Sequence, residues 1–142
     1  MKKRKGKIEI TQTLKEEISR LAEEYGLVLV MLFGSQSRGD AHEGSDIDVA
    51  FRPGKPLSEK QEAALNYELV KIFRNDRVDT VDLSRVSPLL RRRILEDVSL
   101  LYDRSGLAFP TFELYALRSY IEAMPLFNIR REKLRAALAS II

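Results

Sequence analysis

Two aspartates spaced two residues apart carry the clearest chemical signal in this sequence. Asp46 and Asp48 lie in the segment 45–51, where polar and apolar residues alternate as they do in a β-strand. Side chains two apart on a strand share a face, about 6–7 Å apart at their backbones, so both carboxylates can converge on one point. Their repulsion, roughly 1–4 kcal/mol, disappears when a cation binds between them. Oxygen ligands without His or Cys suit Mg²⁺. An isolated Asp-x-Asp is usually only an exposed acidic strand face, so the pair predicts a magnesium site only in combination with the residues that precede it.

A glycine and a serine stand ten residues before this acidic pair. Gly34-Ser35 directly follows the apolar run 27–33, which predicts a buried central strand. A glycine at this point lets the backbone turn and present its amides, which can hold phosphate oxygens together with the Ser35 hydroxyl. Arg38 can add a charge-assisted contact. A phosphate cradle beside a metal site is what phosphoryl or nucleotidyl transfer needs. His42 in the same loop is expected to be an exposed side chain without a catalytic role.

Strands and helices alternate along the chain, which predicts an α/β fold around one sheet. A capping box at Thr13 predicts a helix that ends at Gly26, and Ser58 with Gln61 predicts a second helix to about residue 73. Strands are expected at 77–83 and 98–102, with a short helix from Ser87-Pro88 between them. A last helical region is expected to break at Pro125. We therefore divide the chain into a basic tail (1–7), a domain (8–108) and a C-terminal helical segment (109–142).

The two-part motif resembles a known family. Gly34-Ser35, ten residues, and Asp46-Ile47-Asp48 match the Gly-Ser-x10-Asp-x-Asp signature of the DNA polymerase β-like nucleotidyltransferases. More closely, residues 33–39 and 45–50 are similar to minimal nucleotidyltransferase (MNT) domains, the antitoxins of HEPN/MNT toxin–antitoxin modules. The likeness covers about residues 14–104. It implies a mixed sheet with helices mainly on one face, and two Mg²⁺ ions bound by Asp46 and Asp48.

The family's third carboxylate lies on the neighbouring strand, where this sequence offers two candidates. Alignment of the stretch 78–83 with the family favours Asp79. Strict alternation instead groups Asp82 with Thr80, away from the apolar side chains, and favours Asp82. We place Asp79 first, because a β-bulge can break the alternation.

The resemblance implies an enzyme that moves AMP from ATP to a tyrosine of a cognate HEPN ribonuclease, which silences that toxin. Gly34, Ser35 and Arg38 would bind the nucleotide, and Asp46, Asp48 and Asp79 would be the catalytic metal ligands. Two other functions stay open: an antitoxin that neutralises its toxin by binding alone, and a nucleotidyltransferase acting on a small molecule. A homodimer is also open.

Charge, cysteine content and the length of apolar runs indicate which partners and which cellular location to expect. Five positive charges in the first seven residues exceed the net charge of +3, so the pI near 9.2 reflects the tail and not the body. A nucleic-acid partner is therefore not expected. No apolar run is long enough to span a membrane, and the absence of cysteine fits the cytoplasm. The arginine run 91–93 is predicted to be a solvated helix face. Tyr115 and Tyr120 are predicted to pack, or else to dock a partner helix.

Overall fold

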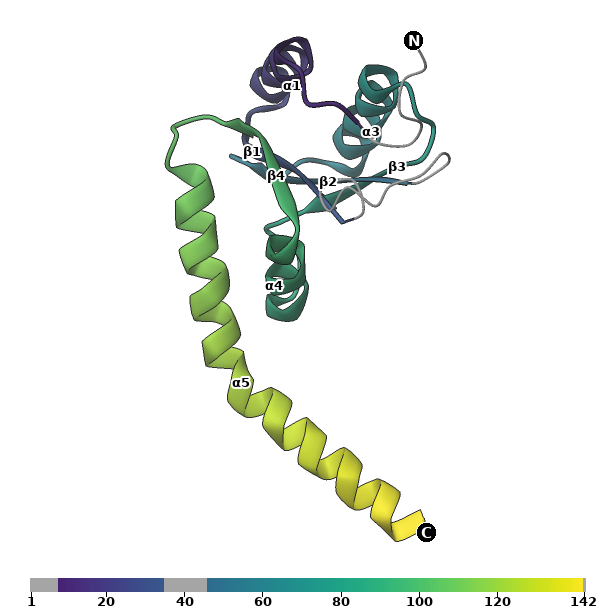
Figure 1. The fold of residues 1–142 in the computed structure, drawn as a ribbon, viewed down its shortest axis with the longest axis vertical. Helices are drawn as coiled ribbons and strands as arrows, with labels where there is room; N and C mark the ends of the chain where they lie inside the picture. The colour runs from purple at the N-terminus through teal and green to yellow at the C-terminus, as the bar shows by residue number, and fades with distance from the viewer. Residues whose placement is uncertain (1–7, 35–45, 142) are drawn as a thin grey trace.

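The computed structural model describes residues 8–34 and 46–141 (Figure 1). Within these ranges four strands form one sheet and four helices accompany it. In chain order the elements are α1 (Gln12–Tyr25), β1 (Leu27–Phe33), β2 (Ile47–Pro53), α3 (Glu59–Phe73), β3 (Val78–Asp82), α4 (Pro88–Glu96), β4 (Val98–Asp103) and α5 (Ala108–Ile141). None of the helices in this part of the chain has the length and apolar composition needed to cross a membrane.

The sheet has the strand order β3-β2-β1-β4, so β1 is central, as predicted for residues 27–33, β2 is also central, and β3 and β4 are the edge strands. β1 is antiparallel to both β2 and β4, whereas β2 and β3 are parallel and are connected through α3. The mixed sheet confirms the predicted α/β class. Because β2 and β3 are parallel and β1 is antiparallel to β2, the starts of β2 and β3 lie at the same end as the last residue of β1.

Apolar side chains cover both faces of the central strands. On one face, α1 and α3 pack over a core that includes Ile18 and Phe51. On the other face, α4 and the first turns of α5 contribute Ile94 and Phe112, which pack with Met31. Figure 1 shows these two pairs of helices on opposite sides of the sheet. Alternation along a strand therefore cannot by itself separate a packed face from a functional one.

Two of the predicted helix boundaries are confirmed by their caps. The Ser58 hydroxyl accepts a hydrogen bond from the Gln61 amide at 3.1 Å, and the Gln61 side chain accepts one from the Ser58 amide at 2.8 Å. This capping box opens α3. Gly26 ends α1 with φ 65°, in the left-handed region that glycine adopts without strain.

The predicted capping box at Thr13 is wrong. Thr11 is the N-cap of α1, and its hydroxyl oxygen accepts a hydrogen bond from the Leu14 amide at 3.1 Å. Starting the helix two residues earlier adds the bond from the Lys15 amide to the Thr11 carbonyl, also 3.1 Å. Both threonines are capping residues by type, and the longer helix gains the extra backbone bond.

The predicted break at Pro125 is also wrong, because α5 is a single helix of 34 residues with Pro125 inside it. A proline removes one amide donor and strains the preceding turn, and a helix can accommodate this by bending. Figure 1 shows that α5 changes direction along its length and that its distal end extends away from the sheet.

One carboxylate anchors the start of α5. Asp103 Oδ1 accepts hydrogen bonds from the amides of Ser105, Gly106 and Ala108, and Oδ2 accepts one from the Phe109 amide, at 2.9–3.2 Å. Burial alone would raise the pKa of Asp103, but these four backbone donors outweigh it and lower the pKa. The end of β4 and the first turn of α5 are thereby tied together.

The sequence predicted that the arginine run 91–93 on α4 is a solvated helix face, but one of its three residues is buried. Arg91 is only 8% exposed, and its guanidinium carbon lies 4.8 Å from the ring centroid of Tyr115. Arg92 lies 5.2 Å from the ring centroid of Tyr120 in the same way. The prediction is wrong for Arg91 because α5 packs alongside α4 and Tyr115 lies over the Arg91 guanidinium, whereas Arg92 and Arg93 are exposed as predicted. These contacts agree with the packing role expected of Tyr115 and Tyr120.

Candidate active site

Asp48 and Asp79 occupy matching positions on neighbouring strands. Asp48 is the second residue of β2 and Asp79 the second residue of β3, and the two are register partners in the parallel pair. Directly opposed residues on adjacent strands have side chains on the same face, so both carboxylates face the same side of the sheet. On its other flank Asp48 is opposite Phe33, the last residue of β1. The site thus lies where three strands meet.

Gly34 is held against the Asp48 carboxylate. Its φ is 73°, and a Cβ at this position would lie 2.8 Å from Asp48 Oδ2, closer than side chains tolerate. Both the backbone conformation and the short distance therefore require glycine at position 34. The sequence predicted a glycine for a sharp turn beside phosphates, and the structure adds that its backbone lies against the Asp48 carboxylate.

The carboxylates at this strand end repel one another. Burial raises the pKa of Asp48 above its ordinary value, and the negative charges of Asp79 and then Asp46 raise that pKa further. Asp46 is exposed and immediately precedes β2, two residues from Asp48. Three acids are thus close enough to influence one titration. Among residues 8–34 and 46–141, no ion pair neutralises Asp48 or Asp79.

A side chain on α3 holds the start of β3. Asn66 Nδ2 donates a hydrogen bond of 2.8 Å to the carbonyl of Val78, the residue before Asp79. The backbone of the same region is tied to β2 by the Ile47 amide, which donates to the Arg77 carbonyl at 2.8 Å. These bonds fix Asp79 relative to Asp48. Sequence reasoning missed Asn66, since a single asparagine on a helix carries no signal of a contact to a strand.

Asp82 lies elsewhere and has its own partners. It is three residues further along β3, opposite Phe51 in register and 9% exposed. Its Oδ1 accepts hydrogen bonds from the Ser84 amide at 2.9 Å and the Ser84 hydroxyl at 2.5 Å. Its Oδ2 lies 3.5 Å from Arg85 Nε. The alternation argument assumed that the face of β3 carrying Val81 is only a packed face. That face also carries Asp79, which lies opposite Asp48, whereas Asp82 is on the other face, opposite Phe51.

The bulge invoked for Asp79 is not needed either, since the β2–β3 register runs from Ile47 to Phe51 without a shift. Three predicted residues, Ser35, Arg38 and His42, lie outside the described residues. The structure therefore brings together Gly34, Asp46, Asp48 and Asp79 and leaves Asp82 apart.

The acidic end of the sheet fits a hard cation in its chemistry. Its donors are all carboxylate oxygens. Burial is the main cause of the raised pKa of Asp48, and the negative charges of Asp79 and Asp46 add a repulsion that a cation between the acids would remove. No three His, Cys, Asp or Glu side chains of the described chain are already gathered closely enough to hold a metal ion. The residue types fit Mg²⁺, whose shell is usually completed by water and substrate phosphates.

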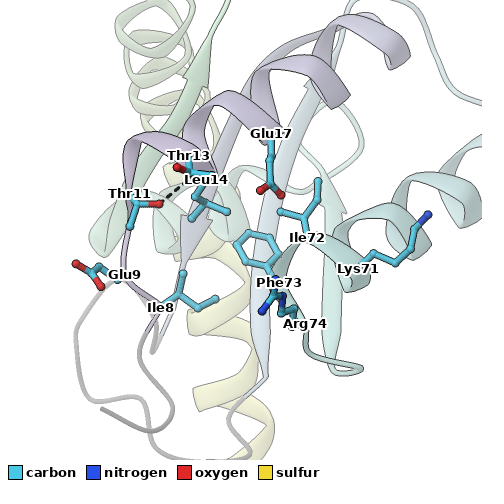
Figure 2. Close-up of a pocket in the computed structure, with 10 residues that line it drawn as sticks. All are labelled: Ile8, Glu9, Thr11, Thr13, Leu14, Glu17, Lys71, Ile72, Phe73 and Arg74. Carbon is cyan, nitrogen blue, oxygen red and sulfur yellow. Dashed lines mark hydrogen bonds between the residues drawn. The ribbon is translucent and has the colours of Figure 1, made fainter. Parts of the chain in front are cut away.

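A cavity of about 700 Å³ opens at the same end of the molecule but on the other face of the sheet. Figure 2 shows that its lining comes from the start of α1, the segment before it and the end of α3. Leu14 and Phe73 belong to the core under these helices, opposite the face that carries Asp48. No predicted site residue lines this cavity. It is therefore separate from the acidic site.

Comparison with known proteins gives consistent matches. The family model described as "Polymerase beta, Nucleotidyltransferase" matches residues 16–106. A Methanocaldococcus jannaschii protein provisionally named a protein adenylyltransferase is 31% identical over 84 residues, which is 59% of this chain and 89% of that protein. The protein adenylyltransferase MntA of Aphanizomenon flos-aquae is 27% identical over 118 residues, 76% of this chain and 78% of that protein.

Solved structures with the same fold include a toxin–antitoxin crystallised with AMP-PNP. One of its chains superposes with a TM-score of 0.69 at 25% sequence identity, and the match covers 87% of this chain and 98% of that chain. AMP-PNP is an analogue of ATP. The matched residues 16–106 include Gly34, Asp46, Asp48 and Asp79.

Proposed function

Because the chain belongs to the polymerase β-like nucleotidyltransferase family, we propose that it transfers AMP from ATP to a tyrosine of a HEPN ribonuclease toxin and thereby neutralises that toxin. The family match and the structural similarity confirm the predicted fold. Two relatives are named protein adenylyltransferases, and a structural neighbour is a toxin–antitoxin with an ATP analogue. The single observation that carries the proposal is the register pairing of Asp48 with Asp79 beside Gly34.

The acids have the central roles in this proposal. Asp46, Asp48 and Asp79 would hold Mg²⁺, and two ions are expected as in other two-metal transfer sites. When bound, Mg²⁺ would polarise the triphosphate and offset the charge of the departing pyrophosphate. Gly34, Ser35 and Arg38 would bind the phosphates. The cytoplasmic setting inferred from the sequence stays a prediction.

Asp79 is the proposed base of the reaction. The tyrosine oxygen attacks the α-phosphorus of ATP, the bond to the β-phosphate bridging oxygen breaks, and pyrophosphate leaves. The phenolic proton passes to the Asp79 carboxylate, which is exposed and can therefore reach an incoming side chain. Asn66 keeps this carboxylate in register with Asp48 by holding the Val78 carbonyl.

Labelled transfer tests the proposal directly. The purified protein is incubated with a purified HEPN-domain protein, Mg²⁺ and ATP labelled at the α-phosphate. We expect label on a tyrosine of the toxin, none with γ-labelled ATP, and none with Asp48→Asn. Transfer of label from γ-labelled ATP would indicate a kinase instead. Neutralisation of the toxin by Asp48→Asn, with no label on the toxin for either protein, would indicate a binding antitoxin.

Magnesium dependence is tested separately by chelation. We expect transfer to stop in excess EDTA and to return when Mg²⁺ is restored, because the acidic site then regains its cation. Wild-type protein should also be stabilised by Mg²⁺ with ATP through mass action. The Asp46→Asn/Asp48→Asn variant should lose this stabilisation, and a full response in that variant would contradict the assignment of the metal ligands.

A further inference from the structure

Residues 117–141 of α5 carry a mainly apolar stripe whose distal positions, beyond Phe127, are exposed. Its positions are spaced three and four residues apart in turn, the spacing of a coiled-coil seam. They are Leu117, Tyr120, Met124, Phe127, Arg131, Leu134, Leu138 and Ile141, called here the α5 stripe. Leu134, Leu138 and Ile141 are 61%, 54% and 80% exposed. Exposed apolar surface of this extent on one helix face marks a site of interaction.

The α5 stripe continues the face by which α5 packs on the body. Phe112 and Ala116 are buried in the core, and Tyr120 follows four residues later on the same face. The Tyr120 ring lies under Arg92 of α4 and 5.9 Å from the ring of Phe127, measured between centroids. The packed face and the stripe are therefore one continuous surface. Figure 1 shows its distal part extending beyond α4.

The charges beside the stripe decide what can cover it. Arg130 and Arg135 occupy the two flanking positions on either side of Leu134, and Arg131 interrupts the stripe itself. The one acid of this region, Glu132, lies off the stripe. An acidic partner helix would pair with these arginines, whereas a second basic helix would repel them.

A second copy of this chain fits the stripe poorly. A parallel pair would place the same arginines against each other. A fully overlapped antiparallel pair would place the basic segment 130–135 against the segment 123–128, which contains no acid. Neither arrangement places a negative charge beside Arg130 and Arg135.

We infer that the α5 stripe docks a helix of the acceptor protein, one with an apolar seam flanked by Glu or Asp. The inference rests on the proposed function for the identity of that acceptor. It assigns the recognition of the partner to a surface remote from the acids that perform the transfer. The same contact would hold the acceptor in place while its tyrosine reaches Asp79.

Binding of the purified HEPN protein by calorimetry tests this inference with matched variants. The stripe variant Leu134→Glu/Leu138→Glu should bind roughly tenfold or more weakly than wild type, because it puts carboxylates into a buried apolar seam. The control Leu126→Glu/Ile129→Glu adds the same charge at exposed apolar positions on other faces of the helix and should bind like wild type. All four positions are exposed, so circular dichroism should show that both variants stay folded.

The charges are tested by a second matched pair. Arg130→Glu should weaken binding and reduce its dependence on salt, because it removes a flanking charge. Lys133→Glu, the same reversal three positions away and off the stripe, should change binding less. Equal loss in both would mean that the arginines act only through net charge, which would contradict the acidic-helix partner.

Other outcomes would overturn the inference. Equal toxin binding by wild type and the stripe variant would place the interface elsewhere. Wild-type dimers in sedimentation that the stripe variant abolishes would assign the surface to a second copy. Binding to phosphatidylglycerol vesicles that the stripe variant loses would assign it to a membrane. Asp48→Asn should still bind the toxin without transferring AMP.

The docking and the proposed enzyme activity can be told apart. If the stripe is needed for binding but wild type transfers no AMP, the docking inference is confirmed and the proposed activity is wrong.

Discussion

The two ends of β3 hold the same residue type in opposite surroundings. Asp79, at the first end, is exposed and opposite Asp48, and its charge contributes to raising the pKa of Asp48. Asp82, at the other end, is buried, accepts two hydrogen bonds from Ser84 and lies beside Arg85. The protein itself supplies partners to Asp82, whose Oδ1 accepts both bonds and whose Oδ2 has the ion contact with Arg85 at 3.5 Å, whereas no described side chain pairs with the Asp79 carboxylate. A satisfied charge serves the fold, and an unsatisfied one is available to a ligand.

The largest expected effect separates the two aspartates by activity. Asp79→Asn should lower the turnover of AMP transfer by roughly 10²–10⁴-fold, the range for losing a general base. Asp82→Asn should keep turnover close to that of wild type, measured with labelled ATP at a temperature where both variants are folded. If Asp82→Asn were the inactive variant and Asp79→Asn the active one, the comparison would be reversed.

The free energy of unfolding should depend on Asp82 and not on Asp79, the reverse of the effect on activity. Asp82→Ala should lower the free energy of unfolding by roughly 1–3 kcal/mol, because Ser84 and Arg85 lose a buried partner. Arg85 also pairs with Glu62 of α3 at 3.1 Å, so the loss extends to the helix. Asp79→Ala should leave the free energy of unfolding nearly unchanged in urea titrations without metal. A similar loss in both variants would mean that Asp79 also supports the fold.

Gly34 gives a smaller effect that has an internal control. Gly34→Ala should cost about 1–2 kcal/mol for its left-handed backbone, plus the clash of the new Cβ with Asp48 Oδ2 at 2.8 Å. Gly26→Ala has a similar φ of 65° but meets nothing within 4 Å, so it should cost the backbone term alone. The difference between the two, from chemical denaturation, measures the contact with Asp48. Equal costs would mean that the carboxylate moves aside freely.

The smallest expected effect is the pH dependence of Asp48. Because the folded pKa of Asp48 is raised, the native state binds this proton more tightly than the unfolded state does. Wild-type stability should therefore fall as pH rises from the unfolded pKa through the raised folded pKa. Asp48→Asn lacks this loss, so without metal it should become more stable relative to wild type between acid and neutral pH. Saturating Mg²⁺ with ATP should remove or reverse the difference at neutral pH.

The acidic site was predictable to the extent that it is encoded in local spacing. The interval from Gly34 to Asp48 and the capping pair Ser58–Gln61 depend on residues near each other in sequence, and the structure places them as expected. The choice between Asp79 and Asp82 depended on which face of β3 is covered. α4 and α5 cover part of the face that carries Asp79. The alternation of residues within one strand gives no information about which helices pack on each face.

The misplaced helix boundaries have the same origin. Thr11 and Thr13 are equivalent capping residues locally, and the helix adopts the start that adds a backbone bond. Pro125 is a strong local signal to end a helix, yet α5 continues through it. Asp103 was missed although an aspartate followed by Ser105 and Gly106 is a recognisable capping signal. Arg91 was misassigned because the tyrosines that cover it lie on a later helix.

The connection of β2 to β3 through α3 has a consequence for how the protein folds. Asp48 and Asp79 belong to one continuous β–α–β stretch, whereas β4 joins β1 only after the whole of that stretch has been crossed. Contacts that close shorter loops tend to form earlier. We therefore expect the amides of β2 and β3 to gain protection in pulsed hydrogen exchange before those of β4. Asp48 and Asp79 would then come together before β4 has joined the sheet. Mg²⁺ should therefore speed the refolding of wild type but not of Asp48→Asn/Asp79→Asn.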